Sequence, residues 1–173
     1  MFLLCLFRER EYNIEVMKKE VTLRITSKQY AETLEPSGEA FKRALELEDS
    51  LEIITEGTLY SKKNATYIAY DESEEAGLHN SRTLLRLGDG RLQIIRYGDS
   101  EEESMDMTLE PGVLNITQIR LPQVASYDLE VYTNSLDGEI DEAGNGNISV
   151  DYRIKFDKFF SRRTKLDIDV RAN

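Results

Sequence analysis

Arg96 is the charged residue whose neighbours in the sequence most constrain its chemistry. In residues 91–97, Leu92, Ile94 and Arg96 occupy every second position, so in a strand they share one face. If that face is buried, the guanidinium lies among aliphatic side chains, where an unpaired charge costs several kcal/mol of stability. We therefore expect Arg96 to pair with an anion.

Two kinds of anion could pair with Arg96, and the sequence leaves both open. The first is a carboxylate of the same chain, such as Glu72, which would make the pair structural. The second is the head group of a bound acid, the arrangement by which a small barrel holds one ligand. Tyrosine hydroxyls need hydrogen-bonding partners when buried, either in a packed core or in a binding site. The candidate ligand-binding residues are therefore Arg96, Glu72, Tyr67, Tyr70, Tyr132 and Tyr152.

Residues for nucleophilic catalysis or zinc binding are scarce. The chain has one histidine, His79, and one cysteine, Cys5, and it has no Gly-x-Ser-x-Gly motif that could place a nucleophile beside the histidine. A zinc site of nitrogen and sulfur ligands needs more such residues than one chain provides. We expect no catalytic residues, and the chain is not predicted to be an enzyme.

One acidic segment has the first part of a calcium-loop pattern. Asp137, Glu139 and Asp141 have the spacing of the first three ligands of such a loop. Glu142, however, stands where the loop requires glycine, and Ile148 stands where the bidentate glutamate should be. The pattern fails, so the sequence predicts no metal site and no cofactor.

The overall charge excludes several classes of protein. The 173 residues include 22 Lys and Arg against 33 Asp and Glu, which gives a net charge of −11. This excess repels phosphate and argues against a nucleic-acid partner. The longest apolar run, residues 1–7, is far shorter than the about 20 residues of a membrane-spanning helix, so no membrane partner is expected. These features favour a cytoplasmic protein.

The first sixteen residues differ in pattern from the rest of the chain. The apolar residues 1–7 precede the charged run 8–11, which is the reverse of the order in a signal peptide. One interpretation is that residues 1–16 are an extension outside the fold, that Met17 is the true initiator, and that one domain occupies residues 17–173. The other is a short helix that binds a membrane surface or a partner, although seven apolar residues cover little area for such binding.

From Met17 onward, apolar residues recur at every second position, as in strands with one buried face. Asp89-Gly90 and Asn145-Gly146 are typical of two-residue hairpin turns. About ten consecutive short strands with short links predict antiparallel pairing, and a sheet of this length commonly closes on itself to remove its edges. The predicted fold is therefore all-β, a single antiparallel β-barrel. The expected strands lie at residues 21–26, 51–60, 65–70, 81–87, 91–97, 103–109, 113–121, 126–136, 148–157 and 165–171.

Residues 37–49 depart from the strand pattern. Phe41, Ala44, Leu45 and Glu48 follow a candidate cap, Ser37, at helical spacing, which favours a short helix or an irregular insertion. The alternative is that this stretch and residues 51–60 form one long strand.

Several short motifs resemble those of a known family. They are Thr55-Glu56-Gly57-Thr58-Leu59-Tyr60, Tyr67-Ile68-Ala69-Tyr70-Asp71-Glu72 and Ile95-Arg96-Tyr97-Gly98. In their order, the chain resembles the YwiB-like family of bacterial calycin-type β-barrels of unknown function, from about residue 17 to residue 170. The resemblance implies a closed barrel related in shape to lipocalins and fatty-acid-binding proteins, and it implies no established activity.

The function expected from these observations is non-catalytic binding of a small amphipathic or acidic molecule inside the barrel. The alternative is a protein-interaction module or a homodimer that acts through an outer barrel face. A cavity of several hundred Å³ open to solvent would favour the first function. An interior filled by side chains, together with an exposed apolar patch, would favour the second.

Overall fold

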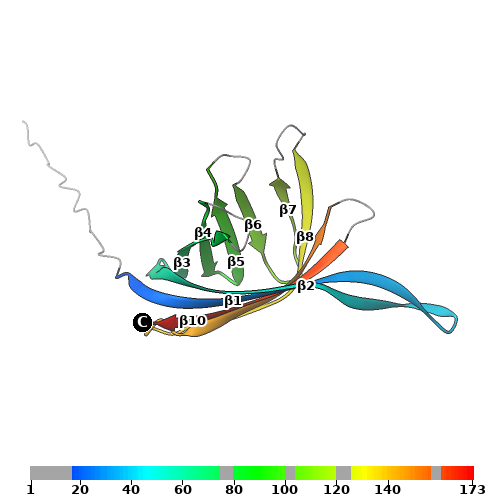
Figure 1. Ribbon diagram of the computed structural model, residues 1–173, viewed down its shortest axis with the longest axis horizontal. Coiled ribbons are helices and arrows are strands. Elements are labelled where there is room, and N and C mark those ends of the chain that lie inside the picture. Colours follow the sequence, from blue (N-terminus) through cyan, green and yellow to red (C-terminus); the bar gives the residue numbers. More distant parts are fainter. Residues whose placement is uncertain (1–16, 75–79, 100–103, 120–125, 157–160) are drawn as a thin grey trace, which may run out of the picture.

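The computed structural model describes residues 17–74, 80–99, 104–119, 126–156 and 161–173 (Figure 1). The N-terminal extension predicted for residues 1–16 lies outside the described residues, and so does His79. No α-helix occurs among the residues that are described, and no helix there is long and apolar enough to cross a membrane.

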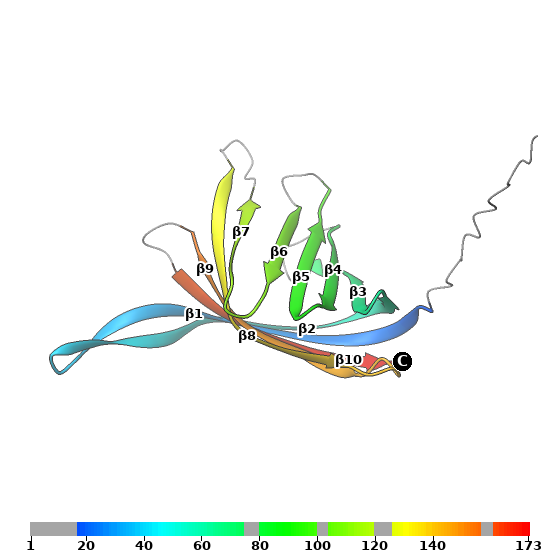
Figure 2. The ribbon, with the colours of Figure 1, turned by 180° about the vertical axis from the view of Figure 1, so that it is seen from behind.

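Ten strands form one antiparallel sheet, in the order β6-β5-β4-β3-β2-β1-β10-β9-β8-β7. The strands are β1 (Lys19–Ser37), β2 (Ala40–Lys62), β3 (Ala65–Asp71), β4 (Arg82–Gly88), β5 (Arg91–Tyr97), β6 (Met105–Leu109), β7 (Leu114–Ile119), β8 (Tyr127–Ile140), β9 (Gly146–Lys155) and β10 (Ser161–Ala172). The two views show β1, β2 and β10 running along the base, with β3 to β6 standing across them (Figures 1 and 2). The predicted all-β, single-sheet fold of ten antiparallel strands is confirmed.

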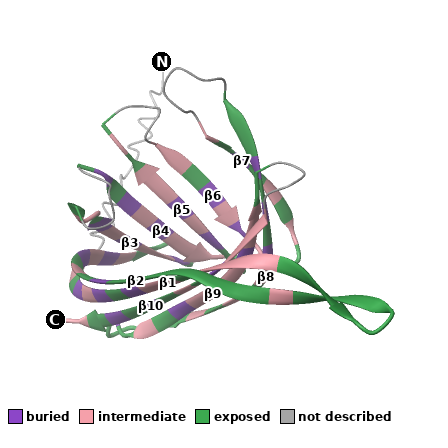
Figure 3. Cartoon of the chain, turned by 45° about the vertical axis from the view of Figure 1, so that its right-hand side comes forward, coloured by how far each residue is buried: buried purple, intermediate pink, exposed green. Residues whose placement is uncertain are grey.

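The apolar alternation of the sequence becomes the two faces of this curled sheet. We call the face that carries the core the inner face and the opposite one the outer face. In the body of the sheet, inner-face residues are buried at every second position along most strands, which gives the alternating bands of burial in Figure 3. The largest fully buried apolar side chains are Leu23, Ile68, Leu85, Leu92, Leu109, Ile148 and Ile168.

The sheet is not closed, which corrects the prediction of a closed barrel. The edge strands β6 and β7 follow one another in the chain, but no backbone ladder joins them within the described segments. Side chains bridge the seam instead: the Asn115 amide donates to the carbonyl of Thr108 at 3.0 Å, and the Thr117 hydroxyl donates to that of Asp106 at 3.3 Å. Among the described residues, these side-chain hydrogen bonds lie where a backbone ladder would join the two edges of a closed barrel.

Residues 37–49 are strand, so the prediction of a helix is wrong and the alternative of one long strand is confirmed. The chain turns at Gly38, whose φ of 65° is in the left-handed region that glycine tolerates, and β2 then runs without a break to Lys62. Phe41 and Leu45 are four residues apart, which fits both the helical period and the strand period. The cross-strand pairing with β1 decides between them.

Candidate functional site

Arg96 lies on the inner face of β5 and forms an ion pair with Glu72. Leu92 and Ile94, on the same face, are buried as the alternation predicts. Arg96 Nη2 lies 3.5 Å from Glu72 Oε1, and the carboxylate side chain is 4% exposed whereas the arginine side chain is 25% exposed. Of the two anions considered from the sequence, the structure contains the protein carboxylate.

Two hydroxyls complete the surroundings of the Glu72 carboxylate. Thr83, on β4, donates to Glu72 Oε1 at 2.5 Å, and the Tyr70 hydroxyl hydrogen-bonds with both Thr83 and Glu72. Burial, and next the negative charge of Glu72, raise the pKa of Tyr70 well above its ordinary value. Tyr70 is therefore a neutral donor at physiological pH. The Glu72 carboxylate thus has one cation and two hydroxyl partners, whereas Arg96 Nε is buried without a hydrogen-bond partner among the described residues.

Tyr152 connects this network to the next part of the inner face. Its side chain is buried on β9, and its hydroxyl hydrogen-bonds with Thr164 of β10. Burial raises the pKa of Tyr152, although the hydrogen bond with Thr164 and the positive charge of Arg96 lower it in part. Arg96 and Tyr152 both lie on the inner face of the sheet.

The other two candidate tyrosines lie on the outer face, away from Arg96. Tyr67 stacks on Tyr60, with ring centroids 5.0 Å apart, and its hydroxyl accepts a hydrogen bond from Arg86 Nε at 3.3 Å. Tyr132 is exposed on β8, opposite Leu114 of β7. The structure thus brings together Arg96, Glu72, Tyr70 and Tyr152, and it separates Tyr67 and Tyr132 from them.

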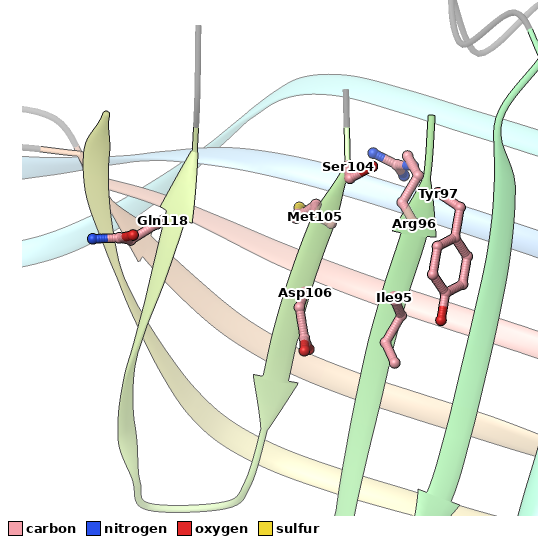
Figure 4. Close-up of a pocket in the computed structure, with 7 residues that line it drawn as sticks. All are labelled: Ile95, Arg96, Tyr97, Ser104, Met105, Asp106 and Gln118. Carbon is pink, nitrogen blue, oxygen red and sulfur yellow. The ribbon is translucent and has the colours of Figure 1, made fainter. Parts of the chain in front are cut away.

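A hollow of about 260 Å³ lies at the seam of the sheet, close to Arg96. Figure 4 shows the Arg96 side chain near the end of β5, beside Ser104. Ile95 and Tyr97 are its neighbours in the strand and lie on the opposite face. The lining comes from both faces of the sheet, because Gln118 and Asp106 belong to the outer face. This hollow is a surface gap at the open edges and not an interior cavity.

A larger pocket, of about 430 Å³, opens on the inner face beyond Tyr152. Its apolar walls come from one side chain each of β7, β8 and β9 and from the residue that follows β9, and its polar atoms come from β1, β9 and β10. The apolar residues are Ile119, Leu129, Ile154 and Phe156, and the polar residues are Gln29, Tyr152, Arg162 and Thr164.

Arg162 is the cation of this pocket, and its position depends on a bulge in β2. Its Nη1 donates to Gln29 Oε1 at 2.9 Å, and its Nε lies 3.2 Å from Glu48 Oε2. Gln29 pairs with Asp49 and Tyr30 pairs with Leu47, so Glu48 is the extra residue of the bulge. A bulge redirects a side chain from its regular position, which here brings a carboxylate to the pocket.

Sequence reasoning missed Gln29, Arg162 and Thr164. A signal for them existed, because Thr164 and Arg162 continue the alternation of the buried Ile168 and Leu166, and Gln29 continues that of β1. That alternation places all three on the inner face. The register that joins β1 to β10 across more than 130 residues is what brings them together.

The described residues contain no group of three or more His, Cys, Asp or Glu side chains arranged to hold a metal ion. The pocket residues are a guanidinium, an amide, two hydroxyls and apolar walls. This set binds by hydrogen bonding, charge and apolar contact.

Comparisons with known proteins agree with the fold. The crystal structure of the ywiB protein from Bacillus subtilis superposes with a TM-score of 0.67 at 20% sequence identity, over 90% of this chain and 93% of that chain. No curated protein matches the sequence significantly. Residues 40–168 match a domain of unknown function, DUF1934. The resemblance to the YwiB-like family is thereby confirmed, and the chain belongs to the DUF1934 family.

Proposed function

We propose that this protein binds a small amphipathic acid, without catalysis, in the inner-face pocket beyond Tyr152. The observation that carries the proposal is the pocket itself, which combines about 430 Å³ of space, apolar walls and one arginine. Small-molecule sites are typically concave, about 300–1,000 Å³ in volume, and mostly apolar with a few polar groups that orient the ligand.

The apolar part of the ligand would lie against Ile119, Leu129 and Ile154, with Phe156 at the pocket margin. Phe156 is partly exposed and packs against Tyr127, with ring centroids 5.3 Å apart. An alkyl chain or ring that covers these side chains removes apolar surface from water, at about 25 cal/mol per Å². This contact supplies affinity but little selectivity.

The acidic head group would lie at Arg162, with Gln29 and Thr164 beside it. The Arg162 guanidinium and the Glu48 carboxylate are each more than a third exposed, so their pairing is of modest strength and a ligand carboxylate can compete with it. A guanidinium has five donors, which allows it to hold a ligand and a protein acceptor together.

This assignment moves the ligand-binding cation from Arg96, where the sequence placed it, to Arg162. Arg96 is paired with the nearly inaccessible Glu72, and neither residue lines the pocket. We therefore propose that Arg96 and Glu72 do not contact the ligand and instead stabilise the inner face of the sheet.

Calorimetric titration with decanoate and with decanol tests the proposal, because the two probes share a chain and differ in charge. Arg162→Gln should weaken decanoate binding about tenfold, which corresponds to about 1.4 kcal/mol, and leave decanol binding nearly unchanged. Arg171→Gln is the matched control: Arg171 is on the same strand, but it is exposed on the outer face. It should change neither affinity.

Two results would contradict the proposal. One is that the unaltered protein binds neither probe at millimolar concentration. The other is that Arg162→Gln and Arg171→Gln weaken decanoate binding equally, because binding would then depend on overall charge and not on the pocket.

A further inference from the structure

The β1–β2 hairpin extends well beyond the rest of the sheet. We call residues 30–47 the arm; it consists of the cross-strand pairs from Tyr30 with Leu47 to Ser37 with Ala40. The pairing of β1 with β10 ends at Ala31, so most of the arm is a two-stranded ribbon. Both ribbon views and the burial view show it projecting from the body, and nearly all of it is exposed (Figures 1, 2 and 3).

The two faces of the arm differ sharply in composition. Paired residues share a face, so the pairs alternate between the faces along the ribbon. One face is polar or small, with Thr33, Glu35, Ser37, Ala40, Lys42, Ala44 and Glu46. The other, which we call the apolar arm face, has Leu34, Pro36, Phe41, Leu45 and Leu47, together with Glu32 and Arg43.

The apolar arm face is largely open to solvent. Leu34 is 66% exposed, Phe41 is 73% exposed and Leu47 is 53% exposed. A two-stranded ribbon without a layer packed on it is marginally stable in water, and contiguous exposed apolar surface marks an interaction site. The arm therefore needs a partner that covers this face.

The body of the chain presents a surface that complements the arm. On the outer face of β7 and β8, Leu114 is 55% exposed and Ile116 is 65% exposed, and Tyr132 is the cross-strand partner of Leu114. We call these three residues the body patch. Glu130 pairs with Ile116 on one side and with Lys155 on the other, and Tyr132 pairs with Arg153, so the border of the patch contains one exposed carboxylate between two cations.

Both surfaces contain charges of both signs that can pair between two copies. Arg43 lies within the apolar arm face; its side chain is 65% exposed and 3.8 Å from Glu32. Glu130 lies beside Ile116 in the body patch. When the arm packs its leucines on Leu114 and Ile116, Arg43 can pair with Glu130, which in its own chain faces Lys155. Such a pair between copies favours association of a chain with a net charge of −11.

The area supports a reciprocal contact between two copies. Eight residues per strand at about 3.3 Å each, in a ribbon about 10 Å wide, give a face of about 260 Å². The body patch is smaller than this face, so full coverage of one arm also uses the outer face of β7 and β8 around the patch. One such contact then buries at most about 500 Å² in total, and two bury at most about 1,000 Å², the lower limit for a specific interface. Two-fold symmetry supplies both contacts, because each copy has one arm and one patch.

We propose that the protein forms a two-fold dimer in which the apolar arm face of each copy packs on the body patch of the other. This goes beyond ligand binding and uses the opposite face of the sheet. The arm projects away from its own β7 and β8, so the patch that it covers is that of the second copy (Figures 1 and 2).

Analytical ultracentrifugation of the full chain at micromolar concentration tests the dimer. The unaltered protein should sediment as a dimer, and Leu34→Ser with Phe41→Ser should sediment as a monomer. The matched control changes the cross-strand pair on the polar arm face, Glu35→Ser with Lys42→Ser, and should remain a dimer. Circular dichroism should give equal melting temperatures for both double variants as monomers at high dilution, because neither change touches the core.

A charge exchange identifies the surface that the arm covers. Arg43→Glu and Glu130→Arg should each weaken the dimer at least tenfold, because every contact in either homodimer then brings like charges together. An equimolar mixture of the two variants should recover the dimer, because the mixed dimer has one contact with the native charges and one with the charges exchanged. A monomeric unaltered protein, or a Leu34→Ser, Phe41→Ser variant that remains a dimer, would overturn the proposal. Loss of the dimer in Arg43→Glu but not in Glu130→Arg would overturn the assignment of the body patch.

Discussion

The Arg96–Glu72 pair gives the sharpest test of how the interior is stabilised. We expect Arg96→Met to destabilise the protein strongly, because it leaves the Glu72 carboxylate buried without a cation. Glu72→Gln should cost less, since the remaining charge belongs to the more exposed partner. The double variant should be more stable than the sum of the two single changes predicts.

The magnitudes follow from the geometry. At 3.5 Å and an effective dielectric constant of about 20, the direct attraction is about 5 kcal/mol, part of which desolvation offsets. Breaking a buried pair from one side typically costs about 3–5 kcal/mol. Thr83 and Tyr70 still donate to the carboxylate after Arg96→Met, so we expect about 3 kcal/mol for that change. For Glu72→Gln we expect about 2 kcal/mol, and for the coupling about 1–2 kcal/mol.

Urea unfolding of the four proteins at pH 7 measures these free energies, with equal slopes as the condition for comparing them. A matched control is the outer-face pair of Arg24 and Glu52, which is 3.7 Å apart with both side chains 55% exposed. Removing either partner there should cost less than about 0.5 kcal/mol. If Arg96→Met is as mild as Arg24→Met, the interior pair contributes no more than a surface pair and the reasoning fails.

Other predictions concern β9 and the glycine of the first family motif. Val150→Asp should unfold the domain, because it places a charge in the core. The alternation by itself suggests that Asp151→Val is nearly neutral, but Asp151 accepts two hydrogen bonds from Arg163, at 2.8 and 2.7 Å, so we expect a loss of about 1–2 kcal/mol by urea unfolding. Burial raises the pKa of Asp151, and the hydrogen bonds from Arg163 and Asn134 outweigh this and leave it below its ordinary value. The stability that the Asp151 carboxylate adds is therefore fully present above about pH 4, the pKa range of an aspartate in the unfolded chain, and is lost as the pH falls through the lower pKa of the folded state. The difference in unfolding free energy between the unaltered protein and Asp151→Asn should shrink over that pH range. A difference that stays constant would refute this prediction. Gly57→Ala should cost about 1–3 kcal/mol, because a Cβ there would lie 2.9 Å from the carbonyl oxygen of Ala69; an unchanged unfolding midpoint would contradict this close approach.

The alternation of the sequence predicts ten strands and the position of Arg96, but not the length of the first two strands, which were expected at residues 21–26 and 51–60 and extend over Lys19–Ser37 and Ala40–Lys62. The same alternation also separates the candidate tyrosines. Tyr67 and Tyr70 are three residues apart in one strand and must lie on opposite faces. Tyr132 follows the buried Val131 and must face outward. Residue type alone therefore placed Tyr67 and Tyr132 in the candidate site, whereas the face of each residue in its strand excludes them.

The open seam between β6 and β7 could not be predicted in this way. Closing a sheet depends on whether the last edge presents free backbone groups in register with the first. Here Asn115 and Thr117, which look like ordinary strand residues in the sequence, use their side chains on the carbonyls of β6. That competition depends on the spacing of the two edges, which no local pattern contains.

The bulge at Glu48 links the pocket to the arm and explains why neither was predictable from parity. In β2, Phe41, Leu45, Leu47, Leu51 and Ile53 all occupy odd positions, so an uninterrupted strand would place them on one face. Ile53 pairs with the buried Ile25 on the inner face, whereas Leu47 pairs with Tyr30 on the outer face. One extra residue reverses the faces of β2 and does two things at once: it brings the Glu48 carboxylate to Arg162 in the pocket, and it moves Phe41, Leu45 and Leu47 from the inner to the outer face. Leu34 and Pro36 belong to β1 and face outward in either case. Without the bulge, the apolar side chains of β2 would lie on the opposite face from those of β1, and neither face of the arm would have the combined apolar surface with which to bind a partner.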